Sequence, residues 1–389
     1  MSPALRERLR RAAPFVVAAA WLALGYANLV RGVAHPGVAY RPWAFRHHSY
    51  SDILALSGDR YLGGGRPVPY LQDRIEYPVL LGFTLYLPSF VPGGQWAHFT
   101  VSVLFLAACL FAAVAVLARM PGANPWWLAA TPALAYYGAL NWDLLPIALL
   151  LAALWQHERA RPGRSGALAS LGVCAKLWPV AAAPSVLAAL AGERRWRAAL
   201  GWTAAFAAVA AAVNLPVALL APENWGHFFR YNAGRFAENS VWEIWALRDP
   251  KTLNALGAAF LAASALAAAA GAYRASAASR ARAVRLGTAL VLVVWIATNK
   301  VYSPQYALYA FAGAALVSPP AWLFAALSAI SVVDYHLAFE VRAGRGVFWF
   351  FDRWYFLEEA ARTAIYAALA AWLVAELWRA ARTPGAEGA

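Results

Sequence analysis

The stretch AAPFVVAAAWLALGYANLV, Ala12 to Val30, decides the fold class of this 389-residue chain. It contains no charged residue and approaches the roughly 20 apolar residues that a helix needs to cross a bilayer. Arginines at positions 6, 8, 10 and 11 precede it, as in the basic start of a signal peptide. The apolar part is too long for that, and no small-x-small cleavage site follows. We therefore interpret it as a retained first transmembrane helix.

Further apolar runs continue along the chain. Hydrophobic residues make up 62% of the sequence and charged residues only 13%, which indicates a polytopic membrane protein. We expect a single all-α domain over residues 1–389, built as a bundle of about 12 transmembrane helices. The predicted crossings are 13–31, 96–118, 125–139, 143–157, 166–176, 179–191, 198–220, 253–273, 284–298, 304–318, 321–336 and 361–379.

Two of these crossings, 166–176 and 179–191, are each too short for a full span. They are joined at Lys176-Leu177-Trp178-Pro179, and both flanks are basic. The pair is therefore predicted to enter and return as a broken or re-entrant helix, which requires protein or a cavity to satisfy its backbone. The short run 77–91 is predicted to be an interfacial helix.

The net charge of +14 would point to nucleic acid in a soluble protein, so its distribution matters. With the N-terminus inside, the predicted cytoplasmic segments hold 17 arginines and five glutamates, which accounts for +12 of the total. This asymmetry follows the positive-inside rule and places both termini in the cytoplasm. We expect membrane lipids, and no nucleic acid, as partners.

The outer face then holds nearly every unusual polar residue. Its long segments are 32–95, 222–252 and 337–360, and its short turns are 140–143, 176–179 and 299–304. Nucleotides are scarce outside a cell, and the chain has no Walker-type or dinucleotide-binding glycine motif. A reaction on this face needs its activated group delivered by a lipid.

A set of short motifs carries a family resemblance. In chain order they are Asp52 in the first outer loop, Glu76-Tyr77-Pro78, Asn141-Trp142-Asp143, Lys176 with Pro179, and NKVYSPQY from Asn299 to Tyr306. The ordered set resembles the GT-C glycosyltransferases, most closely the bacterial α-mannosyltransferases of glycosyltransferase family 87, which use polyprenyl-phosphate-mannose. The resemblance covers nearly the whole chain. The family's doubled proline after the tyrosine is here Pro78-Val79, and this departure affects no catalytic group.

The resemblance implies an inverting transfer of mannose from a polyprenyl-phosphate donor to a glycolipid or glycan hydroxyl. The active site would face the outside of a bacterial plasma membrane, and the family implies neither a cofactor nor a metal. Asp52 matches the family's base, which takes the proton of the acceptor hydroxyl. The alternative role of Asp52 is to cap the helix that opens at Ser51 or Asp52.

Loss of a lipid phosphate requires positive charge near the departing oxygens. Lys176 and Lys300 each lie at an outer turn between apolar runs, and Lys251 is the chain's only other lysine. We predict that both bind the donor phosphate, although lysines near an interface also extend toward water without such a role. Four residues are predicted to line the same pocket as Lys300: Asn299, Tyr302, Gln305 and Tyr306.

Five further residues are candidates for binding the sugar or the acceptor: Glu76, Tyr77, Asn141, Asp143 and His336. Glu76 alternatively favours the positive end of a helix, and Asp143 alternatively caps one. A lone histidine such as His336 is more often a hydrogen-bonded structural residue.

Two other classes of protein remain open. A secondary transporter or flippase would also have many crossings and broken helices, but its polar groups concentrate near the bilayer midplane. A non-catalytic assembly factor would not need a base and cations on one face. Within the glycosyltransferases, a sugar other than mannose remains possible.

Overall fold

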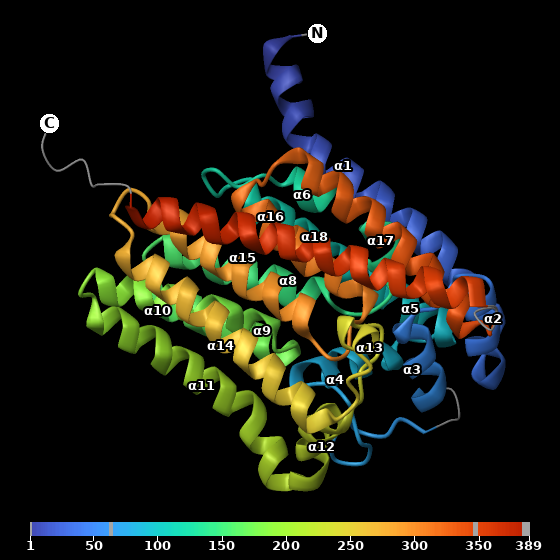
Figure 1. The fold of residues 1–389 in the computed structure, drawn as a ribbon. Helices are drawn as coiled ribbons and strands as arrows, with labels where there is room; N and C mark the ends of the chain where they lie inside the picture. Colours follow the sequence, from blue (N-terminus) through green and yellow to red (C-terminus); the bar gives the residue numbers. More distant parts are fainter. Residues whose placement is uncertain (1, 62–64, 345–348, 383–389) are drawn as a thin grey trace, which may run out of the picture.

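The computed structural model describes residues 2–61, 65–344 and 349–382. Over these ranges the chain is helical, with two isolated β-bridges and no longer strand (Figure 1). Parts of the predicted outer segments 32–95 and 337–360 lie outside the described residues.

Seven helices in the described part are long and apolar enough to cross a membrane. This confirms the predicted all-helical, multi-pass architecture. Each of the seven corresponds to one predicted crossing. They are α1 (Pro3–Leu29), α5 (Gly94–Leu117), α11 (Trp196–Leu220), α14 (Pro250–Arg274), α15 (Arg280–Thr298), α17 (Ala321–Arg342) and α18 (Trp349–Arg382).

The other five predicted crossings consist of shorter helices, so twelve full-length helices are not observed in the described residues. The longest of these, α8, has 15 residues and is about 22 Å long, whereas the hydrocarbon core is about 30 Å thick. Residues 125–139 form two helices in place of one, because Pro132 interrupts the run. The short helices are α6 (Trp126–Ala129), α7 (Ala133–Tyr137), α8 (Leu144–Glu158), α9 (Pro162–Ala175), α10 (Ala183–Gly192) and α16 (Ala307–Val317).

Burial explains why these short helices resemble membrane crossings in sequence. Every residue of α16 is buried within the protein, whereas in α11 only Trp202 and Val217 are buried and the other residues are half-buried or exposed. A hydrophobic run reads the same whether protein or lipid surrounds it. Hydropathy therefore predicts the apolar helices and overestimates how many of them are long enough to span.

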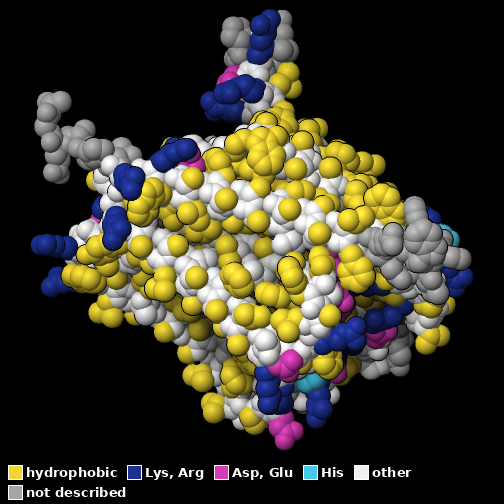
Figure 2. Space-filling model, viewed as in Figure 1, with side chains coloured by type: hydrophobic (Ala, Val, Ile, Leu, Met, Phe, Trp, Pro, Cys, Tyr) yellow, Lys and Arg dark blue, Asp and Glu magenta, His cyan; other side chains and the backbone are white. Residues whose placement is uncertain are grey.

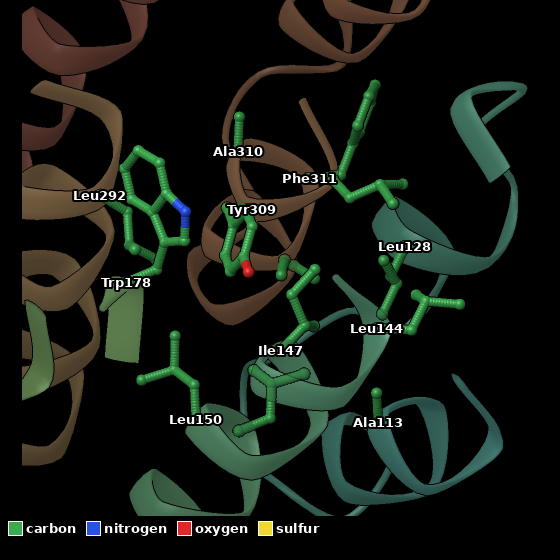
Figure 3. Packing of buried hydrophobic residues seen from close by; sticks show 14 of the residues in the cluster. Ala113, Leu128, Leu144, Ile147, Leu150, Trp178, Leu292, Tyr309, Ala310 and Phe311 are labelled. Atoms are coloured by element: carbon green, nitrogen blue, oxygen red, sulfur yellow. The ribbon is translucent and has the colours of Figure 1, made fainter. Parts of the chain in front are cut away.

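The predicted break after α9 is confirmed. Lys176 is extended, with φ −153° and ψ 148°, and a 3-10 helix over Trp178–Ala182 leads into α10. The ring of Trp178 packs 5.3 Å from that of Tyr309, between α15 and α16 (Figure 3). This aromatic contact fixes the break in the core of the bundle.

The remaining helices lie at one end of the bundle (Figure 1). The segment 77–91 was predicted to be interfacial, but α4 packs against α9 and α11 and buries Val79, Leu81 and Leu85. The helices at this end are α2 (Tyr40–Arg46), α3 (Asp52–Tyr61), α4 (Val79–Tyr86), α12 (Pro222–Gly234) and α13 (Val241–Ile244). The other 3-10 turns cover Val30–Ala34, Gly37–Ala39, Leu87–Phe90 and Pro304–Tyr306.

The predicted cytoplasmic loops meet at the opposite end. Arg285 lies 3.2 Å from the carboxylate of Glu158 and donates to the carbonyl oxygen of Pro121 at 2.6 Å. Arg280 lies 3.2 Å from Glu193. On the face drawn in Figure 2, hydrophobic side chains cover the middle, with Lys and Arg at the left margin and at the lower right. This distribution is typical of a protein that spans a bilayer.

The contact between α9 and α11 gives a test of the packing. A Cβ atom at Gly166 would overlap the carbonyl oxygen of Trp202, whereas a Cβ at Gly163, in the same helix, would meet nothing within 4 Å. We expect Gly166→Ala to lower the free energy of unfolding by about 1–3 kcal/mol through overpacking. Gly163→Ala should raise it by about 0.5 kcal/mol, because alanine favours the helix. SDS titration of both variants in mixed micelles measures the difference, and equal effects would contradict the close contact between the two helices.

Candidate active site

The predicted outer turns meet in one cavity of about 790 Å³ at the end of the bundle that carries α3 and α12. Nine of the twelve predicted site residues line it: Asp52, Glu76, Tyr77, Asn141, Lys176, Asn299, Lys300, Gln305 and Tyr306. Residues from distant parts of the sequence are thus brought together by the helix breaks.

The cavity and the basic loops lie at opposite ends of the same helices. Helix α8 begins directly after Asp143, at the cavity, and ends at Glu158, which pairs with Arg285. Helix α15 begins at Arg280, among the basic loops, and leads to Lys300 at the cavity. The polar groups of the cavity are therefore separated from the basic end by the length of these two helices.

Asp52 is held by two donors. The hydroxyl of Tyr50 donates to Oδ1 of Asp52 at 2.8 Å, and Nδ2 of Asn141 donates to Oδ2 at 2.7 Å. A carboxylate offers about four acceptor positions, so two donors fix its orientation and leave capacity for a hydroxyl in the cavity. This arrangement is suited to receiving a proton from a bound alcohol.

The capping role is taken by the neighbouring serine. The backbone N–H of Ile53 donates to Oγ of Ser51 at 3.2 Å, while Oγ of Ser51 also donates to the carbonyl oxygen of Ala139. The backbone N–H of Asp52 donates to the carbonyl oxygen of Leu140 at 2.8 Å. Its backbone thus anchors the start of α3 to the turn before α8, and its carboxylate is left for the cavity.

Asn141 connects Asp52 with Tyr77. Its Nδ2 group donates both to Asp52 and to the hydroxyl oxygen of Tyr77, the latter at 3.0 Å. Burial raises the pKa of Tyr77, and the nearby carboxylates of Asp52 and Glu76 add to this, so the phenol keeps its proton. Tyr77 accepts from Asn141 and retains a hydroxyl hydrogen that can be donated.

Lys176 is paired in the floor of the cavity. Its Nζ donates to both carboxylate oxygens of Asp143 at 2.7 Å, and it lies 5.8 Å from the centre of the Tyr77 ring. Asp143 is fully buried and does not line the cavity. The carboxylate therefore acts on the site through the lysine it fixes.

Lys300 is only 8% exposed, and its Nζ donates to the carbonyl oxygen of Ala233 at 2.8 Å. Within the described residues it forms no ion pair with a carboxylate. Burial lowers the pKa of Lys300, and the positive charge of Arg235 lowers it further. A buried cation without a counter-ion in the protein favours an anion in the cavity.

Glu76 does not lie in the first turn of α4, which begins at Val79. Its carboxylate accepts from Nη2 of Arg60 at 2.9 Å, and Arg60 also pairs with Asp73. Glu76 lines the cavity as part of this network, which ties α3 to the segment that precedes α4.

Two further predicted site residues lie away from the cavity lining. The hydroxyl of Tyr302 is buried 3.1 Å from that of Tyr366. His336 lies in a second pocket, where its Nδ1 is 2.7 Å from Nδ1 of His48, whose Nε2 is 2.8 Å from Glu340. His48 precedes Asp52 by four residues. His336 thus supports the segment that leads to Asp52.

Sequence reasoning missed four charged residues of the cavity: Arg41, Arg235, Glu238 and Arg342. They lie in or next to predicted outer segments, but nothing in their spacing separates them from solvent-exposed charges. In total, five cations and three carboxylates line the cavity. This excess of positive charge favours anionic ligands.

One wall of the cavity, formed by α12 and α14, is largely apolar, although the same helices also contribute Tyr231, Asn232 and Asn254. Helix α14 contributes Leu253, Ala258 and Leu261, and α12 contributes Phe228 and Phe229. This wall is continuous with the charged part of the same cavity. A ligand with a charged head and a hydrocarbon chain matches both parts.

The comparison with known families identifies the class of protein as a membrane glycosyltransferase. The sequence profile of glycosyltransferase family 87 matches residues 76–319, which is more than half of the chain, so the chain belongs to this family. The match contains Glu76, Asn141, Lys176 and Lys300, and Asp52 precedes it. No curated protein and no solved structure matches the chain.

The Lys176–Asp143 pair gives a test of the cavity floor. Lys176→Met leaves the buried carboxylate of Asp143 without its cation, and we expect the free energy of unfolding to fall by about 3–5 kcal/mol. Adding Asp143→Asn to that variant removes the stranded charge and should restore at least half of the loss. A double-mutant cycle by SDS titration measures the coupling, and strictly additive effects would rule out the buried ion pair.

Proposed function

We propose that the protein transfers a mannosyl or related sugar from a polyprenyl-phosphate donor to a hydroxyl of a glycolipid or glycan. The observation that carries this proposal is that Asp52 lines the same cavity as Lys176 and Lys300. A base and phosphate-binding cations are the two groups that such a transfer needs.

The reaction is a single displacement with inversion. The acceptor oxygen attacks the anomeric carbon of the sugar, and its proton passes to the carboxylate of Asp52. The bond between that carbon and the donor phosphate oxygen breaks, and its electron pair stays with the phosphate. The products are a glycoside, which is an α-mannoside if the donor is β-linked mannose, and a polyprenyl phosphate.

The two lysines stabilise the departing phosphate, which gains negative charge as the bond breaks. Lys300 is the stronger candidate, because it has no carboxylate partner among the described residues. Lys176 supplies charge from the floor, where Asp143 holds it in place. Asn299, Gln305 and Tyr306 line the same side of the cavity and complete the donor pocket.

The apolar wall supports a lipid-borne donor. Phe228 and Phe229 of α12, with Leu253 and Leu261 of α14, offer hydrocarbon contact beside the charged part of the cavity. Burying an isoprenoid chain there is favourable at about 25 cal/mol per Å² of apolar surface.

In the proposed orientation the cavity opens on the outer side of a bacterial plasma membrane, and both termini lie in the cytoplasm. The proposed fold is a GT-C-like bundle of about 12 membrane segments, in which the short helices are included. Support comes from the gathering of Arg280, Arg285 and their neighbours at the end away from the cavity. A transporter is less well supported, because the family to which the chain belongs is one of glycosyltransferases.

Asp52→Asn tests the base. With radiolabelled polyprenyl-phosphate-mannose, a total lipid and glycan extract, and EDTA present, we expect the wild type to transfer label and the variant to lose about 10²- to 10⁴-fold in rate. Asparagine keeps the size of the side chain but cannot take the proton.

Asp59→Asn is the matched control. Asp59 lies in the same helix, pairs with Arg41 at 2.6 Å and does not line the cavity, so its variant should keep its activity within about threefold. Full activity of Asp52→Asn would exclude Asp52 as the base. Absence of transfer by folded wild type would reopen the choice of donor sugar.

A further inference from the structure

Two chain segments far apart in sequence form the side of the cavity that holds Lys300. The backbone N–H of Glu238 donates to the carbonyl oxygen of Lys300, and that of Tyr302 donates to the carbonyl oxygen of Glu238, both at 2.9 Å. Glu238 and Val301 are thus joined as an isolated parallel β-bridge. These bonds tie the segment 233–239 to the turn 299–302 as one structural unit.

This unit carries an excess of positive charge. Glu238 lies 2.5 Å from Arg235 and 3.2 Å from Arg342, and its single carboxylate serves both guanidinium groups. Lys300 adds a third cation and donates only to a carbonyl oxygen. All four side chains line the cavity.

Arg235 and Lys300 repel each other across this side of the cavity. The charge of Arg235 is one of the two causes that lower the pKa of Lys300, the larger being burial. Holding two like charges close together costs free energy, and an anion bound between them would offset this cost. The protein supplies only one carboxylate to this group of three cations among its described residues.

We propose that Arg235 is a third cation of the donor-phosphate site, in addition to the two lysines, and binds the phosphate together with Lys300. This inference rests on the proposed function. It assigns to segment 233–239 a binding role that the sequence does not indicate.

The geometry of a guanidinium suits this role. Arg235 uses Nη2 to bind Glu238, which pins the group in place while its other N–H groups can reach a phosphate oxygen. Lys300 adds a point charge from the facing turn. As the sugar leaves, the phosphate gains negative charge, so two fixed cations stabilise the products more than the donor.

A buried arginine contacts this unit on the side away from the cavity lining. Arg362 donates to the carbonyl oxygen of Asn239 and to Oδ1 of Asp334, each at 2.7 Å, and lies 3.7 Å from the centre of the Tyr302 ring. Arg362 therefore contacts both segments of the unit. It is a positioning residue, since it does not line the cavity.

The test is equilibrium binding of farnesyl phosphate and of farnesol to the purified full-length protein in detergent. We expect the wild type to prefer the phosphate. Arg235→Gln should weaken binding of farnesyl phosphate by about 10- to 100-fold and leave farnesol binding unchanged, because it removes a charge-assisted hydrogen bond. Arg235→Lys should recover part of the loss.

Arg230→Gln is the matched control. Arg230 is exposed on α12, five residues before Arg235, and does not line the cavity. Its variant should bind like the wild type, and equal loss in both variants would reduce the effect to overall charge and overturn the inference.

The outcomes separate the two proposals. If Lys300→Gln loses phosphate binding and Arg235→Gln keeps it, the assignment of Arg235 is wrong and the proposed function stands. If the wild type does not distinguish farnesyl phosphate from farnesol, the phosphate-linked donor fails, and the role of Arg235 fails with it.

Discussion

Backbone N–H and C=O groups that are left unpaired at helix breaks inside an apolar bundle must find hydrogen-bond partners. Residues that supply these partners also line the cavity. The carbonyl oxygen of Leu140, at the break before α8, accepts from the backbone of Asp52. The carbonyl oxygen of Ala233, at the end of α12, accepts from Lys300. Asp52 and Lys300 also present a charged group to the same cavity. Asp52 and Lys300 thus both pair with backbone groups at the helix breaks and contribute charged side chains to the candidate active site.

Long apolar runs in the sequence predicted the helical, multi-pass fold, and the nine cavity-lining residues were predicted from the ordered motifs of the family resemblance together with the position of lysines at the ends of apolar runs. The count of spanning helices could not be predicted, because α16 is enclosed by protein and α11 is not, although both are apolar. Arg235 and Glu238 were missed because their importance depends on a β-bridge to a turn about 60 residues later. Such pairing between distant segments leaves no periodic signal.

Charges in this chain are treated in two ways. Lys176 and Arg362 have buried carboxylate partners at 2.7 Å that hold both cations in fixed positions, and from there Lys176 is proposed to add charge near the donor phosphate. Lys300 donates only to a carbonyl oxygen, and Arg235 shares the carboxylate of Glu238 with Arg342. The charge of both cations is therefore incompletely balanced. Ion pairs that are complete provide rigidity, and those that are incomplete provide affinity for a ligand.

The two kinds of reacting group belong to different parts of the bundle. Asp52 is fixed to the turn before α8. Lys300 follows α15, and Arg235 follows α12. The bridge at Glu238 joins the segments that carry these two cations, at the open end of the α14–α15 helical hairpin. The bridge links the positions of the two cations, whereas the position of Asp52 is fixed separately, through the turn before α8. The distance from Asp52 to the two cations is therefore set by how the α14–α15 hairpin packs within the bundle, and the spacing between the cations is set by the bridge.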